Sequence, residues 1–203
     1  MKSIIAIITC ALLLSSCKPD SPEERSVSLL SEVSTDVIPD QNLIRETLEK
    51  AQAGDAESAW KLGVLFHRLA THMNISHEDG MKLSRYWMQK AADGGCALAM
   101  IDMSSFVLEP AVEEISEKQA EAYTAEGVRL LEEAVREGKA EAIHYQYLSN
   151  CCLAGTGTAQ DISRAREYFR QSLEALPELS EEDKQKVMER WEAQAQRMMS
   201  KLK

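Results

Sequence analysis

A segment that ends in small residues and glycine recurs along this chain, and it constrains the fold more than any other feature. Residues Trp87–Gly95 have the pattern of the last turns of a helix, and Leu130–Gly138 repeat that pattern in the same register. A third copy runs from Gly155 to Ser172. Self-similar units about forty residues apart are typical of stacked helix pairs, because a single pair cannot bury its apolar face. The sequence therefore predicts an all-α fold, an α/α solenoid of about three helix pairs.

The helix ending and the loop before the third copy resemble the Sel1-like repeat, a bacterial relative of the tetratricopeptide helix pair. The residues that match the family's helix ending are Trp87, Lys90, Ala91, Ala92 and Gly95. Those that match its loop and following helix start are Gly155, Gly157, Asp161, Arg164, Ala165 and Tyr168, with Thr158 where the family has Val. The middle copy has an acidic, proline-containing loop at 109–116 instead of two glycines. The resemblance covers roughly residues 54–175, and it implies a surface that binds other proteins.

Apolar periodicity, with Gly, Asp, Ser or Pro at the boundaries, predicts the individual helices. Their expected ranges are 42–53, 56–70, 78–93, 96–108, 117–137, 140–154, 161–176 and 181–201. The last of them carries one apolar stripe at helical spacing, formed by Val187, Trp191, Ala195, Met198 and Leu202. Because the final repeat of a solenoid would otherwise expose its core, we interpret this helix as the C-terminal cap of a domain at 41–203.

Residues 1–16 have the layout of a secretion signal. Lys2 precedes an apolar run from Ile4 to Leu14, which is too short to span a bilayer as a mature helix. The following Ser-Ser-Cys completes a match to the bacterial lipoprotein box. This resemblance implies that Cys17 becomes the first residue and is acylated, with palmitate as the expected lipid, while the alternative is ordinary cleavage that leaves a free thiol. In that family, Lys18 implies transfer to the outer membrane, facing the periplasm.

Residues 17–40 are predicted to be the lipidated Cys and a flexible tether. They contain three prolines and many Ser and Asp residues, with only a weak apolar cluster between Val27 and Val33. A flexible segment of this length has a root-mean-square span of roughly 25 Å, enough to lift a domain off a membrane. The cluster has the composition of a short helix, but we do not expect that helix to pack stably.

The net charge of −10 excludes some classes of partner. Removal of residues 1–16 takes away one positive charge, Lys2, so the mature chain carries −11. Nucleic-acid binding needs a basic surface, and so does adhesion to anionic lipid beyond an acyl anchor, so we expect neither. A basic partner protein is the natural electrostatic complement. The alternative is that the charge only keeps a secreted helical protein soluble.

No pattern in the sequence indicates a catalytic, metal or cofactor site. His67, His72 and His77 are five residues apart, a spacing that does not bring them to one helix face. The glycines at 155 and 157 have neither of the phosphate-loop spacings, so we interpret them as an inter-helix turn. We therefore expect no catalytic residue, no metal and no cofactor.

The repeat register also predicts the state of the cysteines that remain besides the lipid anchor. Cys152 falls at the buried first-helix position that Phe66 occupies in its own repeat, whereas Cys96 comes just before a first helix. These positions differ by about eleven residues, or roughly 16 Å along parallel helices. A disulfide needs Cα atoms within roughly 7 Å, so we expect Cys96 not to bridge to Cys151 or Cys152. All three are predicted to be small buried hydrophobes.

The open face of the first helices is the predicted partner-binding groove. Counted from the repeat register, the residues expected to line it are Trp60, Val64, His67, Ile101, Ser105, Gln146 and Asn150. The alternative for Trp60 and Ile101 is burial between repeats. The lipid anchor, the tether and repeats without catalytic motifs together predict a membrane-anchored periplasmic protein-binding module that is not an enzyme.

The resemblance implies more than one role for such a module. Some lipoproteins with Sel1-like repeats neutralise toxic effectors, notably phospholipases that rival cells deliver into the periplasm, so one expected role is that of an immunity protein. The alternative role is an envelope scaffold or assembly factor. A hydrolase of cell-wall or β-lactam substrates is the alternative from another class. The family members linked to that activity carry regularly paired cysteines within their repeats, which this chain lacks.

Overall fold

The structure, a computed structural model, describes residues 21–33, 40–72, 75–107 and 115–201, and every regular element in these ranges is helical. The elements are α2 (Pro22–Glu32), α3 (Gln41–Gln52), α4 (Ala56–Thr71), α5 (His77–Asp93), α6 (Ala97–Asp102), the 3-10 turn η1 (Met103–Phe106), α7 (Glu117–Arg136), α8 (Ala142–Ala154), α9 (Ile162–Glu174) and α10 (Glu181–Lys201). The predicted all-α fold is confirmed. The predicted signal, Cys17 and most of the acidic loop lie outside the described residues. None of the helices in the described ranges is long and apolar enough to cross a membrane.

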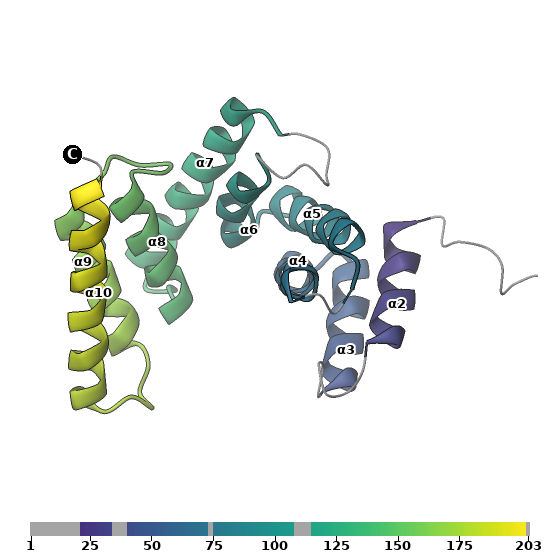
Figure 1. The fold of residues 1–203 in the computed structure, drawn as a ribbon, viewed down its shortest axis with the longest axis horizontal. Coiled ribbons are helices and arrows are strands. Elements are labelled where there is room, and N and C mark those ends of the chain that lie inside the picture. The colour runs from purple at the N-terminus through teal and green to yellow at the C-terminus, as the bar shows by residue number, and fades with distance from the viewer. Residues whose placement is uncertain (1–20, 34–39, 73–74, 108–114, 202–203) are drawn as a thin grey trace, which may run out of the picture.

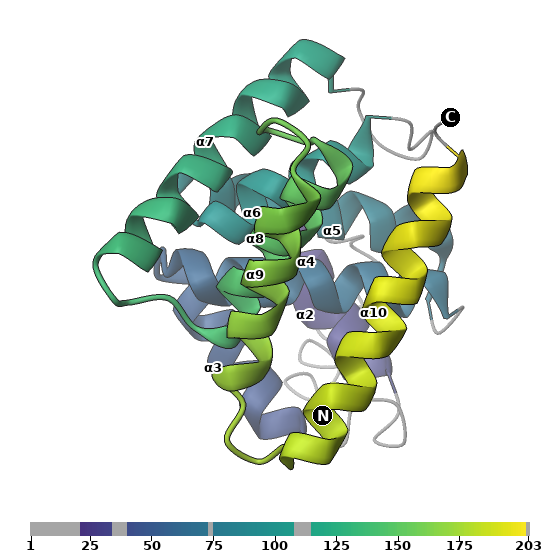
Figure 2. The ribbon, with the colours of Figure 1, turned by 90° about the vertical axis from the view of Figure 1, so that its left-hand side faces the viewer.

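Most helices pack mainly against a neighbour in sequence. α4 pairs with α5, α6 with α7, and α8 with α9, while contacts of α5 with α6 and of α7 with α8 join one pair to the next. The helices follow one another from α2 at one end to α9 and α10 at the other (Figure 1). The turned view shows α8 and α9 between α7 and α10 (Figure 2). The first helices of the three pairs are therefore α4, α6 and α8.

The helix starts follow from side chains that cap the backbone. Asp55, Ser76, Ser116 and Asp161 each accept a hydrogen bond from the backbone N–H three residues further on. Such bonds satisfy N–H groups that the first turn of a helix leaves unpaired. The helices that follow these caps begin at residues 56, 77, 117 and 162, each within one residue of its predicted start.

One helix is shorter than the sequence predicts. Instead of a helix over 96–108, the chain forms α6 and then the turn η1. Ser104 Oγ donates to the carbonyl oxygen of Ile101 at 2.9 Å, and Ser105 Oγ donates to that of Asp102 at 2.7 Å. Local bonds of this kind compete with the α-helical ladder, and short 3-10 turns are frequent where a helix ends. α6 therefore ends at Asp102.

Small residues allow the helices to approach closely. Ala91, in the recurring helix ending, is fully buried at 0% exposure. A Cβ atom on Gly127 of α7 would lie 2.7 Å from the carbonyl oxygen of Ala97 in α6. A Cβ atom on Gly157 would lie 2.8 Å from the backbone of Thr124 in α7. Because the neighbouring atoms belong to the backbone and cannot yield easily, both positions require glycine.

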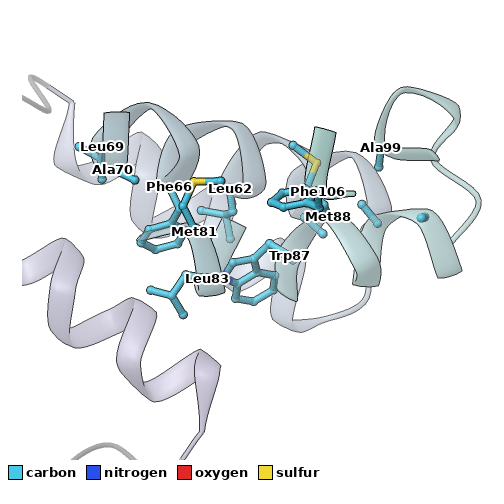
Figure 3. Close-up of a cluster of buried hydrophobic side chains, with 14 of the residues drawn as sticks. Leu62, Phe66, Leu69, Ala70, Met81, Leu83, Trp87, Met88, Ala99 and Phe106 are labelled. Atoms are coloured by element: carbon cyan, nitrogen blue, oxygen red, sulfur yellow. The ribbon is translucent and has the colours of Figure 1, made fainter. Parts of the chain in front are cut away.

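The largest cluster of buried side chains surrounds Trp87, between α4 and α5 (Figure 3). Trp87, Leu62 and Phe66 are all 0% exposed. Tyr86 packs edge-on against the Trp87 ring, with the ring centroids 5.2 Å apart. The Trp87 indole N–H donates to Ser26 Oγ of α2 at 2.8 Å. Because a buried indole N–H without an acceptor is costly, this bond makes α2 part of the core.

Part of the predicted flexible tether is thus a packed helix. Leu29, Leu30 and Val33 are buried in the same cluster as Trp87. Ser21 caps α2 in a reciprocal capping box with the third helical residue, which the sequence analysis did not recognise. The expectation that the apolar cluster at 27–33 would not pack stably was wrong, because its apolar side chains complete the face of the first helix pair.

Polar contacts also hold α2 on α5. Arg25 forms an ion pair with Asp79 at 2.9 Å. Glu23 accepts hydrogen bonds from the Tyr86 hydroxyl and, at 3.0 Å, from Lys90 Nζ. The bond from Tyr86 is the largest cause that lowers the pKa of the Glu23 carboxyl, although burial opposes it. Partly exposed pairs of this kind contribute about 0–1 kcal/mol each, so the apolar side chains dominate the attachment.

Removal of α2 should therefore destabilise the domain. A chain that begins at residue 41 loses the burial of three aliphatic side chains, each worth about 1.5–3 kcal/mol, and leaves the Trp87 N–H without its acceptor. We expect its urea midpoint to lie well below that of a chain that begins at residue 18. In the longer chain, Leu30→Ala should cost about 2–5 kcal/mol, while Val27→Ala, at a half-exposed position of the same helix, should cost far less. Equal midpoints for the two chain lengths would contradict this assignment.

Candidate functional site

The predicted groove residues lie on α4, on α6 with the turn η1 that follows it, and on α8, and all but one of them are at least partly exposed. The half-buried members on α4 are Trp60, Val64 and His67, and the exposed members are Ser105 on η1 and Gln146 and Asn150 on α8. Ile101 is only 9% exposed and packs in a core cluster with Val128 and Leu131 of α7. Its predicted place in the groove is wrong, because it faces the second helix of its own pair rather than the open side.

A single carboxylate joins the three first helices. Asp102, the last residue of α6, accepts a hydrogen bond from Trp60 Nε1 of α4 at 2.9 Å. It accepts a second bond from the Tyr147 hydroxyl of α8, also at 2.9 Å. Both donors bind the same oxygen, Oδ2. Trp60, Asp102 and Tyr147 are each partly exposed, so this polar and aromatic cluster, which we call the Asp102 cluster, is open to the surface.

The surroundings of Asp102 make its charge unusual. Burial raises the pKa of the Asp102 carboxyl, and this effect outweighs the lowering by its two hydrogen bonds and by the positive charge of His67. Burial also raises the pKa of the Tyr147 hydroxyl, and the negative charge of Asp102 raises it further. Tyr147 therefore keeps its proton and acts as a donor. Trp60 carries only a donor, so the carboxylate is held by two neutral N–H and O–H groups.

A pocket of about 300 Å³ adjoins the Asp102 cluster at Trp60. It lies at the N-terminal ends of the first helices, and its lining includes Trp60, Cys96, Leu98, Glu57, Glu141 and His144. Two of these residues are acidic. Glu57 pairs with Lys61 at 2.6 Å, while the backbone N–H of Glu141 donates to His144 Nδ1 at 3.0 Å. The surface beside Trp60 thus offers more carboxylate groups to a ligand than the Asp102 cluster alone.

The three described cysteines are free thiols. Cys152 is fully buried, like its repeat equivalent Phe66, and Cys151 is buried beside it. Cys96 is only half-buried, because it is the N-cap residue of α6. Burial raises the pKa of the Cys96 thiol and raises that of Cys151 to about 11. These thiols are protonated at neutral pH and are therefore weak nucleophiles.

No group of three or more His, Cys, Asp or Glu side chains that could hold a metal ion occurs in the part of the chain that the structure describes. The four histidines lie on different elements or at different ends of them. His67 lies on α4, His72 follows its end, His77 begins α5, and His144 caps the start of α8.

Sequence reasoning missed two members of the Asp102 cluster. Asp102 follows the apolar run from Ala97 to Ile101, so an acidic residue at this point of a first helix was a detectable signal. Tyr147 is adjacent to Gln146, which was predicted, but a shift of one position turns a helical side chain by about 100°. The repeat register was therefore not accurate enough to tell which of Gln146 and Tyr147 on α8 faces Asp102.

Comparisons with family models, with curated proteins and with solved structures found no match to this chain.

The hydrogen bond from Tyr147 of α8 to Asp102 of α6 should contribute to the stability of the domain. Tyr147→Phe removes one donor and leaves Asp102 with Trp60 alone, so we expect a loss of about 1–3 kcal/mol in the free energy of unfolding. Tyr145→Phe is the matched control, because it removes the same atom from the same helix at a hydroxyl that makes no hydrogen bond to other described residues. Urea denaturation of the two variants measures the difference. Equal stabilities would show that the Tyr147 bond does not hold α8 to α6.

Proposed function

We propose that this chain is a non-enzymatic protein-binding module, anchored at the envelope membrane through Cys17, that holds a partner protein on the face of α4, α6 and α8. The observation that carries the proposal is the Asp102 cluster. Its tryptophan, carboxylate and tyrosine come from three different helices, are tied together by hydrogen bonds and stay partly exposed. Aromatic side chains are enriched at protein interfaces, and clusters of this kind act as hot spots.

The neighbouring side chains suit a protein rather than a small ligand. Ser105, Gln146 and Asn150 are exposed on the same set of elements and would form a polar rim around the Asp102 cluster. A polar, solvent-accessible rim around a few anchoring side chains is the usual anatomy of a protein interface. A partner that reaches all of these positions must span three helices, which favours a macromolecule.

The charge of the chain favours a basic partner. The net charge of −10 becomes −11 without residues 1–16, which remove Lys2. A field of this sign speeds the approach of a basic protein and repels an acidic one. Two acidic residues, Glu57 and Glu141, line the pocket beside Trp60 and add to this field locally.

The packed helix α2 changes how an anchor at Cys17 would hold the domain. Only four residue steps separate Cys17 from Ser21, the cap of α2, and an extended chain covers at most about 14 Å over that length. Acylation of Cys17 would therefore keep the α2 and α5 side of the domain near the membrane. This is a tighter attachment than the 25 Å tether expected from composition alone.

An immunity protein is the role we favour within this class. A small acidic protein held close to the membrane suits the occlusion of a phospholipase-type effector, which must itself reach the bilayer. This choice rests on the family resemblance, as does the rival role of an envelope scaffold or assembly factor. A hydrolase remains the alternative from another class, to be tested with cell-wall and β-lactam substrates.

The decisive variant is Trp60→Ala. After a pull-down from native envelopes has identified a partner, the variant should bind it at least about 30-fold more weakly, mainly through faster dissociation, because loss of a hot-spot aromatic costs about 2 kcal/mol or more. Tyr168→Ala, at a half-buried aromatic of α9, is the matched control and should bind as the wild type does. Circular dichroism verifies that both variants fold.

Cell assays extend the same test to the role. For an immunity protein, cells with the Trp60→Ala or the Cys17→Ser variant should lose protection against the periplasmic effector, while cells with Tyr168→Ala keep it. Full affinity and full protection with Trp60→Ala would contradict binding through this face. The acidic loop at 109–117 would then be the next candidate surface.

A further inference from the structure

Asp102 is a carboxylate that forms no ion pair with the described residues, and the charge of His67 acts on it only from a distance. Elsewhere, carboxylates that bridge helices are paired with a basic side chain: Glu23 with Lys90, Asp79 with Arg25, and Glu132 with Arg164. Within the described ranges, Asp102 forms no ion pair, although it is the more deeply enclosed group. Enclosing a carboxylate that has no ion-pair partner is costly, so its presence at this position calls for a reason.

The structural role of the side chain does not supply that reason. Trp60 and Tyr147 both donate to one oxygen, Oδ2. The neutral amide oxygen of an asparagine, placed in the same position, could accept both bonds without the cost of a buried charge. The link between the three helices therefore needs an acceptor, but it does not need a negative charge.

The second oxygen of Asp102 is free to meet a ligand. Oδ1 makes no hydrogen bond to any described residue, and the Asp102 side chain is partly exposed. The indole of Trp60 and the ring of Tyr147 lie beside the carboxylate, since each ring's polar atom is 2.9 Å from Oδ2. The faces of aromatic rings attract cations, so these rings add to the attraction that the carboxylate charge exerts.

We propose that Asp102, flanked by Trp60 and Tyr147, is the binding site for an arginine or lysine side chain of the partner protein. This inference rests on the proposed function and names the chemistry of the group that the partner inserts. The ammonium or guanidinium group donates a charge-assisted hydrogen bond to Oδ1, while the two neutral donors keep Oδ2 in place. Glu141, in the adjoining pocket, provides a further carboxylate for a second basic residue.

The test uses small cations as probes on the chain without residues 1–17, which retains every residue that the structure describes. Methylguanidinium and methylammonium are titrated separately up to roughly 50 mM at constant ionic strength, while the NMR signal of the Trp60 indole N–H is followed. We expect a saturable shift with at least one cation, and which cation binds more tightly tells an arginine site from a lysine site. Urea, the neutral analogue of guanidinium, should give no saturable shift.

Asp102→Asn is the matched variant, because it keeps an acceptor for both donors and replaces the outward oxygen by an N–H₂ group. It should fold with the wild-type spectrum and bind the cation at least tenfold more weakly. Glu121→Gln, which removes an exposed charge on α7, controls for net charge and should bind as the wild type does. The absence of a saturable shift with either cation, or equal affinity in Asp102→Asn, would overturn the inference.

The partner itself separates this inference from the proposed function. If a captured partner binds Asp102→Asn as tightly as the wild type but is lost with Trp60→Ala, the face is correct and the cation site is wrong. If the partner is insensitive to Trp60→Ala as well, the proposed function fails whatever the small cations do. Loss of the partner with both variants supports both proposals.

Discussion

Most helices of this chain depend on a neighbouring helix for the burial of their apolar faces, and much of the structure follows from that constraint. Small residues allow the close packing that this burial requires. Ala91 does so in the recurring helix ending, and Gly127 does so where α7 crosses close to α6. Trp87 is fully buried, and Ser26 of α2 accepts its indole N–H. Close packing of this kind also brings α4, α6 and α8 together, and the Asp102 cluster forms across them.

The fold was largely predictable because its signals are local. Helix caps such as Asp55 and Ser116, and glycines after helix ends, act within a few residues of where they stand, so the helix ranges agreed closely with the structure. The packing of α2 was not predictable in this way. It depends on a hydrogen bond between Ser26 and Trp87, sixty-one residues apart, and no local pattern in a proline- and serine-rich segment reveals such a partner.

The site was only partly predictable for a similar reason. Repeat register selected Trp60, which is half-buried on α4, but it also selected Ile101, which is buried against α7. It did not select the adjacent Asp102, because the role of an isolated acidic residue becomes clear only when its hydrogen-bond partners are known. The donors come from residues 60 and 147, on either side of it in the chain, and only the packing of α4, α6 and α8 brings them together.

Asp102 has a structural role, as the link between three helices, and the binding role that we propose, and the two roles require different properties of its side chain. As a link between helices it needs only an acceptor, whereas as a receptor for a basic side chain it needs its charge and an accessible oxygen. The two donors on Oδ2 reconcile these demands, since they fix the carboxylate while Oδ1 stays available. The charge is costly in the free protein, because burial favours the protonated form, and a bound cation would offset that cost.

The central claim is therefore that a partly enclosed Asp102 carboxylate is held by two neutral donors and forms no ion pair with the described residues. The most direct measurement is the pKa of Asp102, from carbon-13 NMR of its carboxyl group in the wild type and in Tyr147→Phe. Since burial raises this pKa and the Tyr147 bond lowers it, the account predicts a wild-type value above the ordinary 3.8 of an aspartate and a higher value in the variant. A wild-type value at or below the ordinary one, or a variant that titrates like the wild type, would contradict it.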